Sequence, residues 1–399
     1  RPNLYFLGHF NRQRSCNWRD AELSDSENHR RQSSKVRQTY PMAIIEDLKK
    51  LVEFESPSED LAACRGVVEL AVQIANENLK LEAQLIEENS RPIFWWGSKN
   101  PEVILLGHLD TVWPKGSFLP TWSVSGDIAK GPGIFDMKAG FLQAIYAVKE
   151  IPDAHLKVAV IATTDEEVGS QGSKALIERL SKSASAVLVL EASLNGKAKT
   201  GRKGTSMYQI ALRGRASHAG LEPEKGINAT TEIAAIVIEV AKLANPEFGT
   251  TVVPTVMRAG TTTNTVPALA TLDVDIRSYS AAELIRVDSA MKNLVTTHPE
   301  AKLEVTGGIN RPPLELSATS ELYEILEKVA SEIGMAPIGQ ASVGGASDGN
   351  FAAAAGARVL DGLGAVGDGA HALHEQILLS SIPSRVKLLT AFIKELIRD

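Results

Sequence analysis

The stretch VILLGHLD, residues 103–110, begins with four apolar residues, after which come a glycine, a histidine and an aspartate. The pattern returns in LKVAVIATTDEE (156–167), which ends in carboxylates, and in AVLVLEAS (186–193), where Glu191 follows the apolar run. Continuous apolar runs, each followed by helix-like sequence, predict a parallel β-sheet that is buried on both faces, in a fold of the α/β class. Ligands of such sheets bind beyond the carboxyl ends of the strands, so we expect these polar residues to meet at one edge.

Five side chains in these and two further segments have the chemistry of metal ligands. The further segments are GPGIFDMKAG (131–140) and GDGAHALHE (367–375). Imidazole nitrogens and carboxylate oxygens bind zinc, and a carboxylate with two oxygens can bridge two ions, as we expect for Asp136. Two ions suit hydrolysis, because one polarises the carbonyl and the pair lowers the pKa of a bridging water. The predicted ligands are His108, Asp136, Glu167, Glu191 and His371.

Two acids beside these ligands are expected to support the chemistry. Asp110 lies two positions after His108, on the same side of an extended segment, where it can accept the ring N–H and fix the tautomer. Glu166 and Glu167 are adjacent, so in an extended backbone one binds metal while the other, Glu166, faces the water as a general base. A single H-x-D pair or DEE run is more often a surface feature or a helix start. Recurrence at three predicted strand ends favours the site.

Together these segments resemble the co-catalytic zinc exopeptidases and deacylases. That family includes glutamate carboxypeptidase, acetylornithine deacetylase, succinyl-diaminopimelate desuccinylase and the aminoacylases, and the glutamate carboxypeptidase branch is the most similar. The matching motifs, from about residue 43 onward, are GHLD, GIFDMKAG, the Glu166–Glu167 pair, Glu191, and the G-x-H-x-x-x-E frame of His371 and Glu375. The resemblance implies two zinc ions per subunit, replaceable by cobalt or manganese, and a cis peptide bond after Asp136. It also implies that Glu166 is the base, Asp136 the bridge and Asp110 the support of His108.

One ligand has a competitor. His374 lies three residues after His371, and on spacing alone either ring could reach a metal ion. The G-x-H-x-x-x-E frame favours His371. His374 would then lie at the rim of the pocket or be exposed.

The pattern changes between residues 205 and 311. Alternating segments predict strands in SMYQIALRGRASHAG, TTVVPTVMRAG and LATLDVDIRS, and helical periodicity marks GINATTEIAAIVIEVAKLA and AAELIRVDSAMKNLVTTH. We expect an α+β insertion with an antiparallel sheet, which divides the catalytic domain into residues 42–204 and 312–399. The resemblance implies that this insertion is a lid that also carries the contact of a homodimer.

Three residues of the insertion gain a role only from the resemblance. It implies that His218 reaches the active site of the partner subunit and polarises the scissile carbonyl. It also implies that Asn264 and Arg277 bind the substrate carboxylate, a task that suits the planar guanidinium fork. Without the resemblance, His218 would be a solvated loop histidine and Arg277 part of a surface ion pair.

Two further positions have alternative interpretations. Lys203 either adds a second positive charge to the substrate site or is an exposed lysine. Gly345 lies in GGASDGN (344–350), whose glycines permit backbone N–H groups to face a carboxylate. The same stretch is also typical of a turn before a helix, with Ser347 or Asp348 as N-cap.

Composition and charge limit the class of protein. With 399 residues, 44% of them hydrophobic, the chain has enough core for two domains, and a net charge of −6 argues against a nucleic-acid partner. No apolar run reaches the roughly 20 residues that span a bilayer, which argues against a membrane protein. Cys16 and Cys64 give no disulfide framework, so we expect a reducing, cytoplasmic location. Residues 1–41 lack periodicity, and we expect them to be a non-native or disordered extension before a natural start at Met42.

The predicted function is metal-dependent hydrolysis of an amide bond next to a free carboxylate. The substrate would be a small peptide that releases its C-terminal amino acid, or, alternatively, an N-acyl amino acid that is deacylated. A third alternative, from another class, is an inactive metalloprotein that binds carboxylates. It is disfavoured because the base and all five ligand positions are filled.

Overall fold

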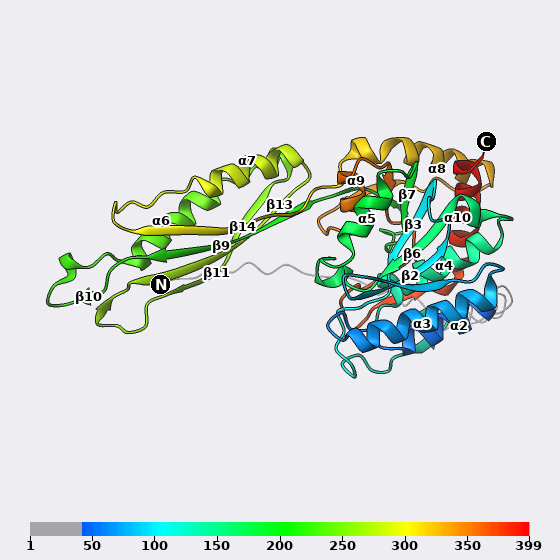
Figure 1. Ribbon diagram of the computed structural model, residues 1–399, viewed down its shortest axis with the longest axis horizontal. Helices are drawn as coiled ribbons and strands as arrows, with labels where there is room; N and C mark the ends of the chain where they lie inside the picture. The colour runs from blue at the N-terminus through cyan, green and yellow to red at the C-terminus, as the bar shows by residue number, and fades with distance from the viewer. Residues whose placement is uncertain (1–41, 399) are drawn as a thin grey trace, which may run out of the picture. The chain divides into compact units, whose positions relative to one another are not determined.

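The computed structural model describes residues 42–398. Its central sheet has six strands in the order β1-β2-β6-β3-β7-β16 (Figure 1). Neighbouring strands from β6 to β16 run parallel. β1 and β2 form an antiparallel hairpin, and β2 pairs antiparallel with β6. The strands are β1 (Gln84–Glu88), β2 (Arg91–Gly97), β3 (Val103–His108), β6 (Val158–Thr163), β7 (Ala186–Val189) and β16 (Val359–Leu360). The prediction of a mostly parallel sheet is confirmed.

Burial explains why these strands lack alternation. Every residue of β3 and of β6 is buried, because helices cover both faces of the sheet. Helices α5 (Lys174–Ser181) and α9 (Gly349–Ala354) contribute to the core on one face. On the opposite face, α4 (Ala139–Lys149) places Phe141 edge-on against Phe94 of β2, with ring centroids 4.9 Å apart. The remaining helices of this part are α2 (Met42–Glu53), α3 (Leu61–Asn78), α8 (Ser320–Glu332) and α10 (Ile382–Leu396).

The inserted segment forms a separate four-stranded sheet in the order β11-β13-β9-β14, with all neighbours antiparallel. Its strands are β9 (Gly204–Arg213), β11 (Thr251–Ala259), β13 (Leu269–Ser278) and β14 (Lys302–Arg311). Helices α6 (Ala229–Ala241) and α7 (Ala281–Lys292) cover one face and share its apolar core (Figure 1). The predicted antiparallel sheet and both predicted helices are confirmed. The domain boundaries and the role of the insertion stay predictions.

Short strands join loops that matter for the site. β4 (Ser123–Ser125), β5 (Ile128–Lys130), β17 (Gly367–Asp368) and β18 (Gln376–Leu378) form one small sheet, in which Gln376 lies opposite Lys130. β8 (Ala198–Arg202) pairs with β15 (Gln340–Val343), and β10 (Ser217–His218) pairs with β12 (Thr265–Val266). The β18–β5, β8–β15 and β10–β12 pairings therefore bring together segments that are distant in the sequence.

Two expectations concern the ends of the chain and the membrane. The expected extension over residues 1–41, with Cys16, lies outside the described residues. Among residues 42–398, no helix combines the length and the apolar character that crossing a membrane requires.

Candidate active site

Five acids and imidazoles converge at the carboxyl ends of the parallel strands. His108 is the last residue of β3, Glu167 follows β6, and Glu191 follows β7. Asp136 lies in the turn Ile134–Lys138 before α4, and His371 lies in the loop between β17 and β18. The peptide bond Asp136–Met137 is cis, so this prediction is confirmed.

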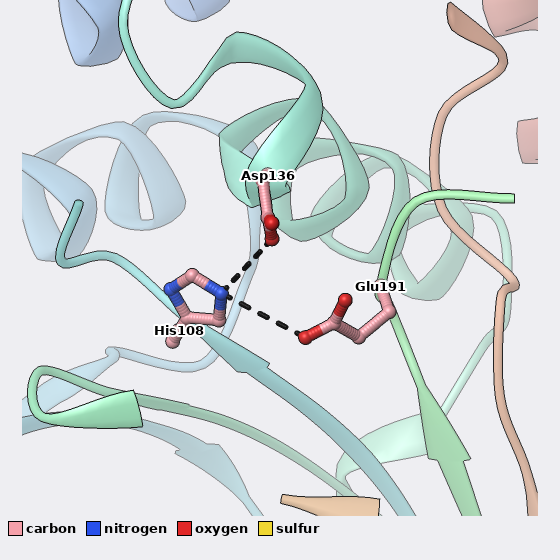
Figure 2. A group of neighbouring side chains, drawn as sticks. All are labelled: His108, Asp136 and Glu191. Carbon is pink, nitrogen blue, oxygen red and sulfur yellow. Dashed lines mark hydrogen bonds and ion pairs between the residues drawn. The ribbon is translucent and has the colours of Figure 1, made fainter. Parts of the chain in front are cut away.

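These residues form two groups that share one carboxylate. One group is His108, Asp136 and Glu191; the other is Asp136, Glu167 and His371. Within each group, the candidate ligand atoms all lie within 4.8 Å of one another. Figure 2 shows Asp136 and Glu191 directed at the same nitrogen of the His108 ring.

The distances fit the donor set of a metal ion. His108 Nε2 lies 3.2 Å from Asp136 Oδ1 and 3.8 Å from Glu191 Oε1. His371 Nε2 lies 3.4 Å from the other oxygen of Asp136, Oδ2, and 3.0 Å from Glu167 Oε2. Two ligands at about 2.1 Å from a tetrahedral zinc ion are separated by about 3.4 Å, so both groups have suitable spacing. Asp136 faces one group with each of its oxygens.

The Glu166–Glu167 pair differs from the expectation in its backbone. We expected extended chain, but Glu166–Val168 form a 3-10 turn that Gly169 ends in the left-handed region, at φ 95°. The two side chains still diverge. Glu167 lies against His371, whereas Glu166 lies in neither ligand group.

Glu166 contacts a cation that sequence reasoning missed. Arg311, the last residue of β14, donates from Nη1 to Glu166 Oε1 at 2.6 Å and from Nη2 to the Glu166 carbonyl at 3.0 Å. Arg311 Nη2 also donates to Ser170 Oγ at 2.9 Å. Burial raises the pKa of Glu166 above its ordinary value, and the guanidinium of Arg311 opposes this rise.

Asp110 lies beside the Nδ1 atom of His108. Asp110 Oδ1 is 3.4 Å from His108 Nδ1, and the backbone carbonyl of Asp110 is nearer, at 3.1 Å. Asp110 Oδ2 accepts hydrogen bonds from Ser58 Oγ at 2.7 Å and from the Glu167 N–H at 3.2 Å. A proton on His108 Nδ1 would leave Nε2 unprotonated, which is the form that binds metal. Sequence reasoning missed Ser58, which lies far from the motifs.

Glu191 is held by a buried arginine that was also missed. Arg202 Nη2 lies 3.1 Å from Glu191 Oε2, and the same guanidinium binds both oxygens of Asp361 at 2.7 and 3.0 Å. Burial and then the charge of Asp136 raise the pKa of Glu191 to about 7, while Arg202 opposes the rise. Because Arg202 occupies Oε2, Oε1 is the oxygen that faces His108.

The two candidate histidines occupy different surroundings. His371 has a left-handed backbone, at φ 62°, and directs Nε2 at Glu167 and Asp136. The His374 side chain is 62% exposed, and its Nε2 lies 4.0 Å from Asp368. The geometry therefore selects His371 as the candidate ligand.

Comparisons with known proteins identify the family of the chain. The family model described as peptidase family M20/M25/M40 matches residues 104–395. The chain belongs to this family. Carboxypeptidase G2 of Pseudomonas sp. strain RS-16 is 31% identical over 377 residues, which cover 89% of each chain. Succinyl-diaminopimelate desuccinylase of Coxiella burnetii is 24% identical over 360 residues, covering 84% of this chain and 94% of that protein.

A solved structure supports the fold. Aminopeptidase PepT of Bacillus cereus superposes with a TM-score of 0.70 at 22% identity, covering 89% of this chain and 98% of that one. Membership of the M20/M25/M40 peptidases makes this protein a metallohydrolase.

Outside the two ligand groups, the predicted substrate residues of this M20/M25/M40 peptidase gather in two places. His218 and Asn264 lie in adjoining segments, because β10 pairs with β12 and the Asn264 carbonyl accepts the Ala219 N–H at 3.0 Å. His218 Nδ1 accepts N–H groups from Gly220 and Leu221, both at 3.1 Å. In the neutral ring the proton is therefore on Nε2.

The second gathering involves Arg277, Lys203 and the 344–345 turn. Arg277 Nη1 donates to the Gly344 carbonyl at 3.4 Å and Nε to Asp275 at 3.0 Å. The Gly345 carbonyl accepts from Arg202 at 3.2 Å. Lys203 is half-buried, and its Nζ lies 5.3 Å from the centre of the Tyr279 ring.

Proposed function

We propose that this metallohydrolase cleaves an amide bond next to a free carboxylate and releases a C-terminal amino acid. The observation that carries the proposal is Asp136, whose two oxygens face two separate groups of candidate ligands. His108, Glu191 and Asp136 would hold one divalent ion, and Glu167, His371 and Asp136 the other. We propose zinc, with cobalt or manganese as substitutes. When bound, such a pair polarises the carbonyl and lowers the pKa of a water between the ions.

Glu166 is the proposed general base. Its side chain, which is 11% exposed, belongs to neither ligand group, so it stays available to a proton. Arg311 occupies Oε1, and we therefore assign proton transfer to Oε2. Glu166 takes a proton from the attacking water and later delivers it to the leaving amine. Burial supports this role, because it raises the pKa of the carboxyl, the direction that favours uptake of a proton.

The carboxylate of the substrate is assigned to Arg277, with Asn264, Gly345 and Lys203. Two positive side chains near one turn support this assignment. Arg277 contacts Gly344, and burial, followed by the charge of Arg277, lowers the pKa of Lys203. A planar guanidinium can bind both oxygens of a carboxylate. His218, with its proton on Nε2, is the proposed donor to the scissile carbonyl.

A hydrolysis screen tests the activity. Zinc- or cobalt-loaded protein is offered N-acyl-glutamates, N-acetyl amino acids and dipeptides, and the released amino acid is measured. We expect metal-dependent release of the C-terminal residue, with N-acyl-glutamates among the best substrates. Preference for N-acetyl amino acids would favour the deacylase alternative. Two bound ions without any turnover would favour the inactive carboxylate-binding alternative and contradict the proposal.

We also propose a homodimer in which His218 completes the site of the partner subunit. Mixing His218→Ala with Glu166→Gln protein tests this idea, because each variant should be nearly inactive alone. After subunit exchange, half of the dimers are mixed and each has one site with both intact residues. Activity should therefore return to about one quarter of the wild-type value, given a two-fold dimer. No recovery despite demonstrated exchange would show that His218 acts within its own chain or not at all.

A further inference from the structure

Glu375 is a buried carboxylate at the centre of four hydrogen bonds. Its side chain is only 1% exposed. Oε2 accepts the indole N–H of Trp113 and the backbone N–H of Gly133, both at 3.0 Å. Oε1 accepts the backbone N–H groups of Phe135 at 2.9 Å and Asp136 at 3.1 Å. Both oxygens are therefore engaged by two donors each.

These donors come from the loops that carry the candidate metal ligands. Trp113 follows His108 by five residues, on the chain that leaves β3. The 133–136 turn ends in Asp136 itself. Glu375 follows His371 by four residues, and the pairing of Gln376 with Lys130 places its loop beside that turn. One carboxylate thus connects the segments of His108, Asp136 and His371.

The carboxylate of Glu375 binds N–H groups of the loops rather than a cationic side chain. Within residues 42–398, its hydrogen-bond partners are the four N–H groups, and the nearby Lys138 instead donates to the Phe54 carbonyl at 2.9 Å. Hydrogen bonds to an ionised acceptor are shorter and stronger than those between neutral groups. A buried carboxylate that satisfies four donors in separate loops restrains the loops relative to one another.

We propose that Glu375 is a positioning residue that holds Asp136 between the two groups of metal ligands. The inference rests on the proposed two-ion site. The bond from the Asp136 N–H fixes the backbone from which the shared carboxylate projects, and the bonds to Gly133 and Phe135 fix the turn before it. Glu375 contacts the backbone N–H of Asp136 and not its carboxylate, so it acts through the loop.

The Glu375→Gln variant separates this role from simple packing. Glutamine has the same shape but replaces one oxygen with an NH₂ group, which is a donor. Whichever way the amide turns, that NH₂ would face two N–H donors. The 133–136 turn or Trp113 must then move, and the spacing between His108, Asp136 and His371 changes with it.

A matched control exists in the inserted segment. Glu232 of α6 is also buried, at 5% exposed, and its carboxylate accepts from the Thr297 hydroxyl and from the N–H groups of Thr297 and His298. It lies in neither ligand group. Glu232→Gln therefore changes another buried carboxylate that accepts several hydrogen bonds, without a connection to the ligand loops.

The experiment compares cobalt binding by wild-type, Glu375→Gln and Glu232→Gln proteins. Affinity is measured by competition with a chelator, geometry by the visible absorption of bound cobalt, and stability of the ion-free protein by thermal unfolding. We expect Glu375→Gln to lose about 10–100-fold in affinity, as for other residues that orient metal ligands, and to change the cobalt spectrum. Glu232→Gln should lower the unfolding temperature and leave affinity and spectrum unchanged.

The outcomes separate the two proposals. Wild-type protein that binds fewer than two cobalt ions would contradict the proposed function. Two ions in the wild type, with the same affinity and spectrum in Glu375→Gln, would overturn the positioning role alone. Should Glu375→Gln fail to fold, Trp113→Phe decides, because it removes one donor and keeps a ring to pack on Phe118, whose ring centre is 5.0 Å away. That variant should lose up to about tenfold in affinity, and an unchanged affinity would refute the role.

Discussion

Glutamine substitutions at the adjacent Glu166 and Glu167 should affect different properties, the reaction rate and the metal content respectively. In the wild type, Arg311 Nη1 lies 2.6 Å from Glu166 Oε1. Glu166→Gln keeps the shape of the side chain and a carbonyl oxygen that can accept the same hydrogen bond. Arg311 also keeps its bonds to the carbonyl of residue 166 and to Ser170. The fold should therefore survive, and both ions should remain, because Glu166 lies in neither ligand group.

The expected loss is in the rate. A general base contributes about 10²–10⁴-fold to a proton-transfer step. At about 1.36 kcal/mol per tenfold change, removing it should raise the activation free energy by about 2.7–5.4 kcal/mol. Glu167→Gln is the matched control, because Glu167 lies 3.0 Å from His371 within a ligand group. It should bind one ion rather than two.

The assay measures metal content and kcat in the same preparations. Elemental analysis after dialysis gives the stoichiometry, and thermal unfolding confirms that each variant is folded. If Glu166→Gln loses an ion while Glu167→Gln keeps both, the roles of the two residues must be exchanged. If Glu166→Gln keeps two ions and the wild-type kcat, Glu166 is not the base.

Three further variants or measurements test the site and the core. His371→Ala should lose one ion and His374→Ala none, as measured by elemental analysis; the opposite result would show that the second histidine is the ligand. Phe141→Ala, in a fully buried ring of α4, should lower the free energy of unfolding by about 3–5 kcal/mol in denaturant titrations. Phe248→Ala, at a position 49% exposed, is the control, and equal losses would contradict the packing argument. Burial raises the pKa of the Cys64 thiol from 9.0 to about 11, so the folded state favours the neutral thiol. The stability that this thiol contributes is complete below pH 9 and is lost as the pH rises through 11. Alkylation of Cys64, followed by peptide mapping, should therefore be slow in the native protein at pH 8, and rapid labelling there would refute the burial.

The central sheet was predictable because its strands are buried on both faces. The side chains of β3 and β6 face helices on each side, so apolar residues occupy every position rather than alternate positions. The inserted sheet has helices on one face, and β13 accordingly alternates between buried and partly exposed residues. In both sheets, the period of the pattern reports how many faces are covered.

The turn at Glu166 shows where such rules stop. Alternation assumes an extended backbone, but the chain leaves β6 through a 3-10 turn. Asp165 stabilises the bend, since its Oδ2 accepts the N–H groups of Gly172 and Ser173. Gly169, three residues after Glu166, was the available signal for a turn.

The cations of the site could not be predicted from local pattern. Arg311 contacts Glu166 across 145 residues of sequence, and Arg202 contacts Asp361 across 159. Each arginine lies at the end of a strand, where a charged residue is ordinary. Only the folded arrangement brings their charges to the buried acids.

The distribution of these charges is itself an argument for divalent ions. Burial of a carboxylate costs free energy unless a cation or hydrogen-bond donors compensate it. Arg311 contacts Glu166 and Arg202 contacts Glu191, whereas the ion-pair partners of the Asp136 and Glu167 carboxylates among residues 42–398 are imidazoles. Burial raises the pKa of both Glu167 and Glu191 to about 7, and the neighbouring charge of Asp136 adds to both shifts. Without metal, the negative charge of these buried carboxylates is costly. Two divalent cations would neutralise that charge, and the ligand atoms already have the spacing to bind them.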